Sequence, residues 1–426
     1  MKVLVVGGGG REHAIIKKLK ESKKKPELYA APGNGGIAAD AVCVPIKATD
    51  IDAMVEYAVE NGIDFCVVAP DDPLVLGMVD AMEEKGIRCF GPSKAAAALE
   101  GSKVFSKGLM KKYGIPTAAY ETFDDPQKAL EYVKAQNSYP TVIKADGLAL
   151  GKGVIIAEDF DAARDGIHSI MEDKIFGQSG NRIVIEEFLT GPEVSVLSFT
   201  DSHTLVPMIS SMDHKRALDG DQGLNTGGMG TVAPNPFYTE KIAKQCMDEI
   251  FIPTMNAMNA EGRPFKGVIY FGLMLTPNGP KVIEYNCRFG DPETQVVLPL
   301  LQGDLLEIFE ACRDERLADV AFSFSARSAA CVMLASGGYP VKYESGKEIT
   351  GLDENGQCDK AVIYHSGTKR VDGKFVTAGG RVLGVSATGK DLMQALGRAY
   401  EAAEGISFEA MHYRKDIGKR ALSAVR

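Results

Sequence analysis

The chain has 426 residues, with 48 Lys and Arg against 57 Asp and Glu and a formal net charge of −9. At 45% hydrophobic and 25% charged residues, the composition excludes a disordered protein, and the negative balance argues against a nucleic-acid-binding one. The 46 Gly in 426 residues are a larger share than the usual ~7%. No repeat or low-complexity tract accounts for the excess. We therefore expect them in the loops of a folded chain of about three domains.

Targeting signals and metal motifs are weak in this sequence. No run of about 18 apolar residues predicts a membrane span, and the apolar run at the N-terminus is too short for a signal-peptide core. The 8 Cys form no C-x-x-C pair, which disfavours a zinc or redox site and favours buried thiols in a reducing compartment. We expect a cytoplasmic protein, monomeric or weakly homo-oligomeric, with no membrane or nucleic-acid partner.

The first expected unit, residues 1–102, alternates short apolar strands with amphipathic helices. This β-α-β-α-β order predicts a doubly wound parallel sheet with right-handed crossovers. We place the strands at 2–6, 27–30 and 65–68, and the helices at 11–20, 50–61 and 74–84.

A mixed α/β unit is expected over 103–320, with a small lid subdomain at about 117–190, and a β-rich unit over 321–426. The second unit opens with a helix that ends near Tyr113-Gly114, and the third closes with a helix at 389–403. Strands are expected at 140–144, 154–157, 183–188, 193–199, 266–275 and 281–285, and a further helix at 303–313.

The glycine run 7–10 lies between a strand and a helix, where backbone N–H groups bind anions. It misses the dinucleotide spacing, and the second strand ends in another glycine loop, 33–36, instead of the acid that would hold a ribose. We favour a phosphate or ribose-phosphate site, with a dinucleotide site and plain tight turns as alternatives. Asp71 ends the third strand at the same sheet edge, and a simple helix cap is its alternative role.

The second glycine loop, 147–153, is not a Walker loop, because Gly153 stands where Ser or Thr should bind magnesium. A loop between two strands can instead cover a nucleotide as a lid. Lys144 and Lys152 would then neutralise phosphates, and an ordinary glycine-rich hairpin is the alternative. Glu186, Glu187 and the nearby Glu193 fit an adenine and ribose slot, or they are simply carboxylates on edge strands.

Residues 282–288 form a strand with a polar stripe. Side chains repeat every two residues, so Glu284, Asn286 and Arg288 share one face. A carboxylate and an amide oxygen suit Mg²⁺, which keeps waters and takes few protein ligands. The alternative is a solvated amphipathic strand.

These motifs together resemble the ATP-grasp superfamily and, within it, the phosphoribosylamine–glycine ligase family. The resemblance covers essentially the whole chain. The motifs are VVGGGGREHA (5–14), PGNGG (32–36), GSK (101–103), KADG (144–147), NTGGMG (225–230), EYNCRFGDPETQ (284–295) and YRKDIG (413–418).

The resemblance implies an N-terminal pre-ATP-grasp domain, ATP-grasp lid and central domains, and a C-terminal β-rich domain. It implies ATP-dependent ligation of glycine to 5-phosphoribosylamine through glycyl phosphate, in purine biosynthesis, with Mg²⁺ or Mn²⁺ bound by Glu284 and Asn286. The implied catalytic residues are Arg288, Lys144 and Asp213. The implied ATP contacts are Lys103, Lys144, Gly151, Lys152, Gly153, Glu186, Glu187, Phe188, Leu189 and Glu193. The implied substrate contacts are Gly9, Gly10, Asn34, Asp71, Asp213, Lys215, Gly228 and Arg288.

Three departures from the family pattern stand out. Leu150 replaces a small residue in the lid loop. Asp71 replaces a Glu and so reaches about one methylene less far. The strand at 271–274 carries no acid, which leaves the coordination of a second metal ion open. The alternatives are another ATP-grasp ligase of a purine intermediate, an NAD(P)-dependent oxidoreductase and a non-catalytic nucleotide sensor.

Overall fold

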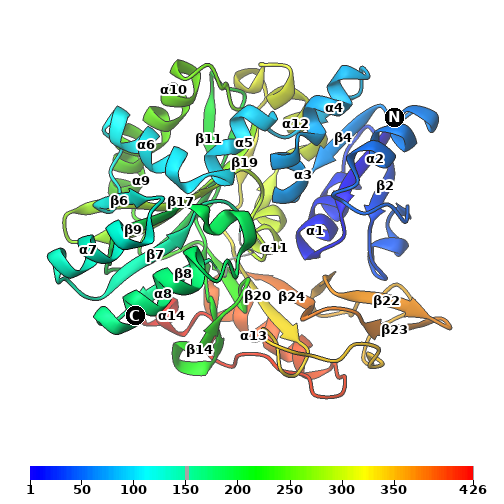
Figure 1. Ribbon diagram of the computed structural model, residues 1–426. Helices are drawn as coiled ribbons and strands as arrows, with labels where there is room; N and C mark the ends of the chain where they lie inside the picture. The colour runs from blue at the N-terminus through cyan, green and yellow to red at the C-terminus, as the bar shows by residue number, and fades with distance from the viewer. Residues whose placement is uncertain (149–152, 426) are drawn as a thin grey trace.

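The computed structural model describes residues 1–148 and 153–425. Four main sheets organise the chain. In Figure 1 the N-terminal elements lie at the right, the expected lid at the left and the C-terminal strands at the bottom.

The N-terminal sheet has the order β3-β2-β1-β4-β5 with every pair parallel, which confirms the predicted doubly wound sheet. Asp50 accepts a hydrogen bond from the Ala53 N–H and so caps α2. The strands are β1 (Lys2–Gly7), β2 (Glu27–Pro32), β3 (Val42–Cys43), β4 (Phe65–Val68) and β5 (Arg88–Phe90), and the long helices are α1 (Gly10–Leu19) and α2 (Ile51–Glu60).

The helix expected at 74–84 is instead two short helices, α3 (Asp71–Leu76) and α4 (Met78–Glu84). Gly77 separates them with φ +99, a left-handed conformation that ends a helix and that glycine adopts readily. The earlier start of α3 brings Asp71 into the helix, and its Oδ1 accepts from the next residue's N–H.

The lid sheet has the order β6-β9-β7-β8, and α7 and α8 pack against it. Hydrophobic side chains of both helices and of the sheet share one small core, separate from the others. The elements are β6 (Tyr120–Phe123), α7 (Pro126–Gln136), β7 (Thr141–Ala145), β8 (Val154–Ala157), α8 (Phe160–Met171) and β9 (Ile183–Glu187).

The central sheet is antiparallel, with the order β11-β10-β16-β17. The predicted hairpin is present, because residues 270–276 of β16 pair with 279–286 of β17. Helix α6 (Lys103–Tyr113) ends at Gly114, as predicted. The other elements are β10 (Glu193–Thr200), β11 (Leu205–Pro207), α9 (Glu240–Cys246), α10 (Ile252–Ala260), β16 (Gly267–Thr276), β17 (Gly279–Asn286) and α12 (Leu305–Arg313).

The C-terminal sheet has the order β12-β15-β20-β24-β21, and helix α13 packs on β20 and β24. Two of its strands, β12 (Met212–Asp213) and β15 (Gly230–Ala233), come from the middle of the chain, and the sequence did not predict them. The C-terminal elements are β20 (Ser328–Ala335), β21 (Val362–His365), the hairpin β22 (Thr368–Val371) and β23 (Lys374–Thr377), β24 (Arg381–Gly389), α13 (Leu392–Glu404) and α14 (Lys419–Ala424).

The N-terminal glycine loops contact the C-terminal domain directly. The Asn34 side-chain amide donates to the carbonyls of Gly8 (2.9 Å) and His365 (2.7 Å). The His365 N–H in turn donates to Nδ1 of His13 at 2.8 Å. Within the described part of the chain, none of the helices combines the length and apolar character that crossing a bilayer requires.

Candidate active site

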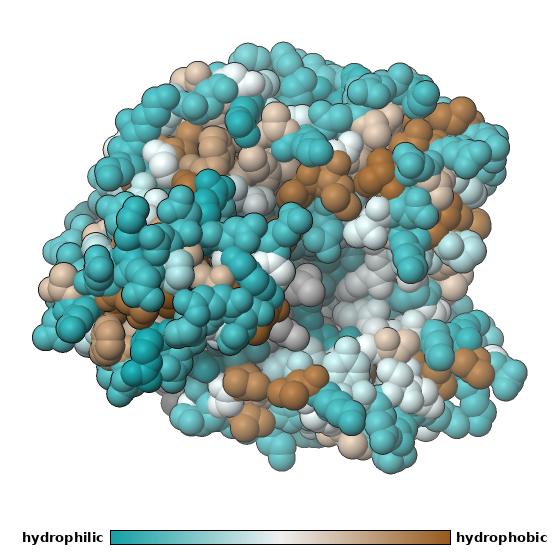
Figure 2. Space-filling model, viewed as in Figure 1, coloured by the Kyte–Doolittle hydropathy of each residue, from teal (hydrophilic) through white to brown (hydrophobic). Residues whose placement is uncertain are grey.

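A cavity of about 470 Å³ lies where the four sheets meet. Figure 2 shows that this face of the molecule is hollowed near its centre. Side chains from the lid, the central sheet and both terminal domains line it. The predicted site residues on its wall are Asp71, Lys103, Lys144, Gly153, Glu186, Glu187, Phe188, Leu189, Glu193, Asp213, Lys215, Glu284, Asn286 and Arg288.

Buried lysines and one glutamate form the lid side of the cavity. Lys144 on β7 contacts Glu186 on the neighbouring strand β9: its Nζ donates to Oε2 at 3.0 Å, and also to the Ile283 carbonyl at 3.1 Å. Lys107 on α6 is 3.2 Å from the same oxygen. Burial lowers the pKa of Lys107 to about 8. Lys107 was not predicted, although it follows Lys103 by one helical turn and shares its face.

The lid loop contacts this cluster through its described ends. Nζ of Lys103 donates to the Gly147 carbonyl at 2.7 Å, and burial lowers the pKa of this lysine. The Gly153 carbonyl accepts from the Ala145 N–H at 2.9 Å. The predicted ATP contacts Gly151 and Lys152 lie outside the described residues.

The chain between β9 and β10 forms an open, partly apolar edge of the cavity. Glu187 accepts from the Ala119 N–H at 3.0 Å and pairs with Lys281 at 2.7 Å, and Lys281 lowers its pKa. Phe188 remains 39% exposed. Leu189 and Glu193 continue this edge, and the apolar side chains of Met110, Val142, Ile156 and Met274 line the space beside it.

Glu284 and Asn286 lie on one face of β17 and both face the cavity. Oε1 of Glu284 is 3.5 Å from Nζ of Lys215, and this lysine lowers the pKa of Glu284 to about 2. Oδ1 of Asn286 accepts from Arg288 at 3.3 Å. The described residues contain no cluster of three or more His, Cys, Asp and Glu side chains that would hold a metal ion unaided.

Arg288 is held between two carboxylates. Its Nη2 is 3.2 Å from Glu100 and 3.7 Å from Asp71. Glu100 also accepts from the Cys287 N–H at 2.7 Å, and burial raises its pKa to about 7. Glu100 was not predicted, because an acid at the end of helix α5 (Lys94–Gly101) resembles any surface acid in sequence.

The half-buried Asp213 lies beside Gly228, and its charge interacts with that of the buried Glu293. Burial, together with the charge of Glu293, raises the pKa of Asp213 well above its usual value. Gly228 has φ +113, and a Cβ there would lie 2.7 Å from Asp213 Oδ1 and 2.5 Å from the Pro292 ring. The backbone at Gly228 is thus packed directly against the carboxylate.

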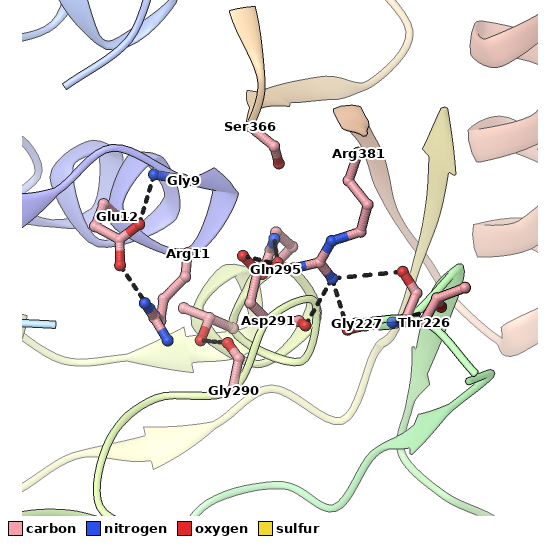
Figure 3. A network of polar contacts seen from close by, with 12 residues as sticks. Gly9, Arg11, Glu12, Thr226, Gly227, Gly290, Asp291, Gln295, Ser366 and Arg381 are labelled. Carbon is pink, nitrogen blue, oxygen red and sulfur yellow. Dashed lines mark hydrogen bonds and ion pairs between the residues drawn. The ribbon is translucent and has the colours of Figure 1, made fainter. Parts of the chain in front are cut away.

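The predicted phosphate loop lies next to the cavity wall. Gly9 donates its N–H to Glu12, and a Cβ on Gly10 would meet Ser366 and Gln295. Gly9, Gly10, Asn34 and Gly228 are not among the lining residues, whereas Arg11, Asp291 and Arg381 are. Figure 3 shows Arg11 and Arg381 approaching the loop of Asp291 from different domains.

Arg381 was missed because it lies in a strand that carries no motif. Its Nη1 donates to the carbonyls of Gly227 (2.6 Å) and Asp291 (2.8 Å), and its Nη2 is 3.3 Å from the Asp291 carboxylate. Arg11 and Arg381 therefore bring positive charge to the cavity from the N-terminal and C-terminal domains.

Three family models match the chain: the phosphoribosylglycinamide synthetase N domain over residues 1–100, its ATP-grasp (A) domain over 101–294 and its C domain over 329–420. A phosphoribosylamine–glycine ligase from Caldanaerobacter subterraneus subsp. tengcongensis is 48% identical over 417 residues, covering 98% of this chain and 99% of its own.

Solved structures are also similar to this chain. A phosphoribosylamine–glycine ligase from Thermotoga maritima superposes with a TM-score of 0.83 at 36% identity, covering 98% of this chain and 100% of its own. The biotin carboxylase domain of a Hydrogenobacter thermophilus 2-oxoglutarate carboxylase, solved with MgADP and bicarbonate, has a TM-score of 0.74 at 16% identity, covering 96% and 91%. At 16% identity, the similarity to the biotin carboxylase domain is evidence for the fold alone.

Proposed function

Because the chain belongs to the phosphoribosylamine–glycine ligase family, and so joins glycine to 5-phosphoribosylamine with ATP in purine biosynthesis, we propose that the cavity holds all three substrates. The main observation that supports this proposal is that three kinds of group line one cavity. Lysines, an oxygen pair on β17 and the acids Asp213 and Glu293 all line the same cavity.

ATP occupies the lid side. The apolar side chains beside residues 187–189 offer a slot for the adenine ring, and Glu193 accepts from the ribose hydroxyls. Lys103 and Lys144 neutralise phosphate oxygens, which they can do as compact point charges. Gly153 and the sequence neighbours Gly151 and Lys152 belong to the loop that covers the phosphates.

Glu284 and Asn286 fit a divalent cation, Mg²⁺ or Mn²⁺. Glu284 is ionised, since its pKa is about 2, and a carboxylate with one amide oxygen is a typical protein share of a magnesium–nucleotide site. When bound, such a cation neutralises the charge of the phosphate oxygens. The remaining ligands are supplied by ATP and water.

Glycine binds beside Asp213. The positive charge of the glycine ammonium favours the ionised form of this carboxyl group, which then accepts from the ammonium. The glycine carboxylate oxygen attacks the γ-phosphorus, the bond to the β-phosphate oxygen breaks, and glycyl phosphate and ADP form. Arg288 and Lys215 offset the negative charge of the reacting oxygens. The Gly228 backbone packs against Asp213 and so holds this carboxylate in place.

Phosphoribosylamine enters from the side of the N-terminal domain. Arg11 and Arg381, with the N-terminus of α1 at Gly9 and Gly10, attract its phosphate. Asp71 faces the ribose, and Asn34 holds the two glycine loops in place. The amine of phosphoribosylamine attacks the glycyl carbonyl carbon and phosphate leaves. The amine gives up one proton.

The test is ADP release with ATP, glycine and phosphoribosylamine, each omitted in turn. We expect release only when all three are present. Release with formate or bicarbonate in place of glycine would indicate another ligase of the superfamily. ATP binding without glycine-dependent turnover would indicate a sensor, and nicotinamide binding by titration would indicate an oxidoreductase.

A further inference from the structure

The segment that carries Asp213, Lys215 and Gly228 belongs structurally to the C-terminal domain. Asp213 on β12 pairs with Thr231 on β15, and Thr231 pairs with Cys331 on β20. Between these strands the hairpin of β13 (Arg216–Leu218) and β14 (Gln222–Asn225) projects outward, and all four residues of β14 are exposed. The hairpin has little packing of its own to fix its position.

Arg414, near the C-terminus, binds this hairpin through its side chain. Its side chain is 1% exposed, and its Nη1 is 3.1 Å from the Arg216 carbonyl and 2.9 Å from the Asp221 carboxylate. Its Nε and Nη2 bind the two oxygens of Asp416 at 2.7 and 2.9 Å. This bidentate geometry is the strong form of an arginine–carboxylate contact.

The rest of the same C-terminal stretch makes three more hydrogen bonds to the hairpin, each between a main-chain group and a side chain. Asp416 accepts from the Gly220 N–H at 2.8 Å, and the Lys415 N–H donates to Asp219 at 2.8 Å. His412 Nε2 is 2.7 Å from the Ala217 carbonyl. Strand β13 and the turn of the hairpin are therefore tied to residues 412–416.

One further contact links this stretch to the cavity wall. The Gly418 N–H donates to Nε2 of His214 at 3.0 Å, and Nδ1 of His214 donates to the Gly230 carbonyl at 3.0 Å. His214 lies between Asp213 and Lys215, and the Lys215 carbonyl accepts from Thr226 at 2.8 Å. Contacts thus run from Gly418 to both edges of the segment that faces the substrates.

We propose that Arg414 and Asp416 form a clamp that positions the segment 213–230 in the cavity. Neither residue lines the cavity, so both are positioning residues. The clamp sets where Lys215 and the loop 226–228 stand relative to Glu284. The proposal deepens the proposed function, on which it rests, by assigning a role to the sequence motif YRKDIG. A buried charge network that loses one partner is left uncompensated, so a change at Arg414 should loosen the hairpin.

The test compares Arg414→Gln and Asp221→Ala with the wild-type chain. Asp221 is 67% exposed, so its variant should fold even if Arg414→Gln does not. For Arg414→Gln we expect kcat to fall roughly tenfold to a hundredfold and KM for glycine to rise, because a small misplacement of aligned groups has effects of that order. Equilibrium binding of an ATP analogue should stay within about twofold, since its contacts lie on the lid side.

Two further variants make the test specific. Lys415→Ala should behave as wild type, because the hydrogen bond from Lys415 to the hairpin comes from its backbone N–H, which the substitution keeps. Arg414→Lys keeps the charge without the fork and should recover part of the activity. Unchanged kcat and KM for glycine in Arg414→Gln would overturn the proposal, as would an equal loss of ATP-analogue binding.

A second readout does not depend on activity. Amide hydrogen exchange in the segment 216–228 should be faster in Arg414→Gln and Asp221→Ala, while exchange in the lid strands stays unchanged. If the wild-type chain shows no glycine-dependent turnover, the proposed function fails, and the exchange result alone decides on the clamp. Unchanged exchange in this segment would overturn it.

Discussion

The ammonium of Lys215 lies 3.5 Å from the carboxylate of Glu284, so the segment that follows strand β12 of the C-terminal sheet faces the oxygen pair on β17. This lysine keeps Glu284 ionised, with a pKa of about 2. We expect Glu284→Gln to remove at least about 2–3 kcal/mol of transition-state stabilisation, roughly a hundredfold in kcat/KM, because an anionic ligand becomes neutral.

The measurement for this variant is ADP release over a Mg²⁺ titration, with thermal unfolding as a check of the fold. The exposed Glu240→Gln on α9 is the matched control and should keep full activity. Near wild-type turnover of Glu284→Gln at saturating Mg²⁺ would contradict the assignment of the cation site.

Glu100 gives the protein a pH-dependent stability. Its pKa is about 7 against an ordinary 4.5, raised mainly by burial. The folded state therefore holds the proton more tightly than the unfolded state, and this stabilising contribution is lost as pH rises from about 4.5 through 7. We expect Glu100→Gln to be more stable relative to wild type at pH 8 than at pH 5.

Urea unfolding of both proteins at the two pH values measures this difference. Glu307→Gln, an exposed position on α12, is the control for a change of charge. An equal effect of Glu100→Gln at pH 5 and pH 8 would show that Glu100 titrates normally.

Gly228→Ala should disable the glycine side of the cavity. The residue has φ +113, and a Cβ would lie 2.5 Å from Pro292 and 2.7 Å from Asp213. Strain of this kind costs on the order of 1–3 kcal/mol, and the loop must shift to relieve it. We expect a rise in KM for glycine, measured by steady-state kinetics.

Gly262→Ala is the matched control for backbone strain alone. Gly262 has φ +68, and nothing lies within 4 Å of a Cβ there. It should cost only stability and leave KM for glycine unchanged. If both variants behave alike, the packing of Gly228 against Asp213 has no special effect.

His13 and His365 should make the contact between the terminal domains acid-sensitive. Burial lowers the pKa of both, to about 3 for His365, so protonation below about 6.5 favours the unfolded state. The stability they contribute is present above pH 6.5 and falls as the pH drops below it.

The melting temperature between pH 7.5 and 5.5 tests this expectation. His365→Gln should flatten the decline, whereas His203→Gln, at an exposed histidine, should leave it unchanged. A decline of the same slope in all three proteins would assign the acid sensitivity to other groups.

Local periodicity was enough to predict the parallel sheet and the stripe of Glu284, Asn286 and Arg288, because both depend on neighbours in the sequence. Lys107 was within reach, since it follows Lys103 at helical spacing. The predicted helix at 74–84 was wrong because a single Gly77 in a left-handed conformation outweighs the apolar pattern around it. The expected domain boundaries stay predictions.

Residues that depend on long-range contacts had no local signal. Glu100 and Arg381 take their surroundings from segments about 190 and 90 residues away in sequence. Strands β12 and β15 joined a sheet whose other members come a hundred residues later. Physical reasoning on a sequence alone cannot supply such pairings, because many partners are compatible with the same apolar pattern.

The bond from Asn34 to the His365 carbonyl spans 331 residues, and this has a consequence for how the protein is made. The N-terminal domain leaves the ribosome long before β21 and β22 are synthesised. Its glycine loops therefore lack their C-terminal partners until translation is nearly complete. Arg381, which lines the cavity, also belongs to the chain's final quarter. A stalled or shortened product would therefore lack this part of the cavity wall.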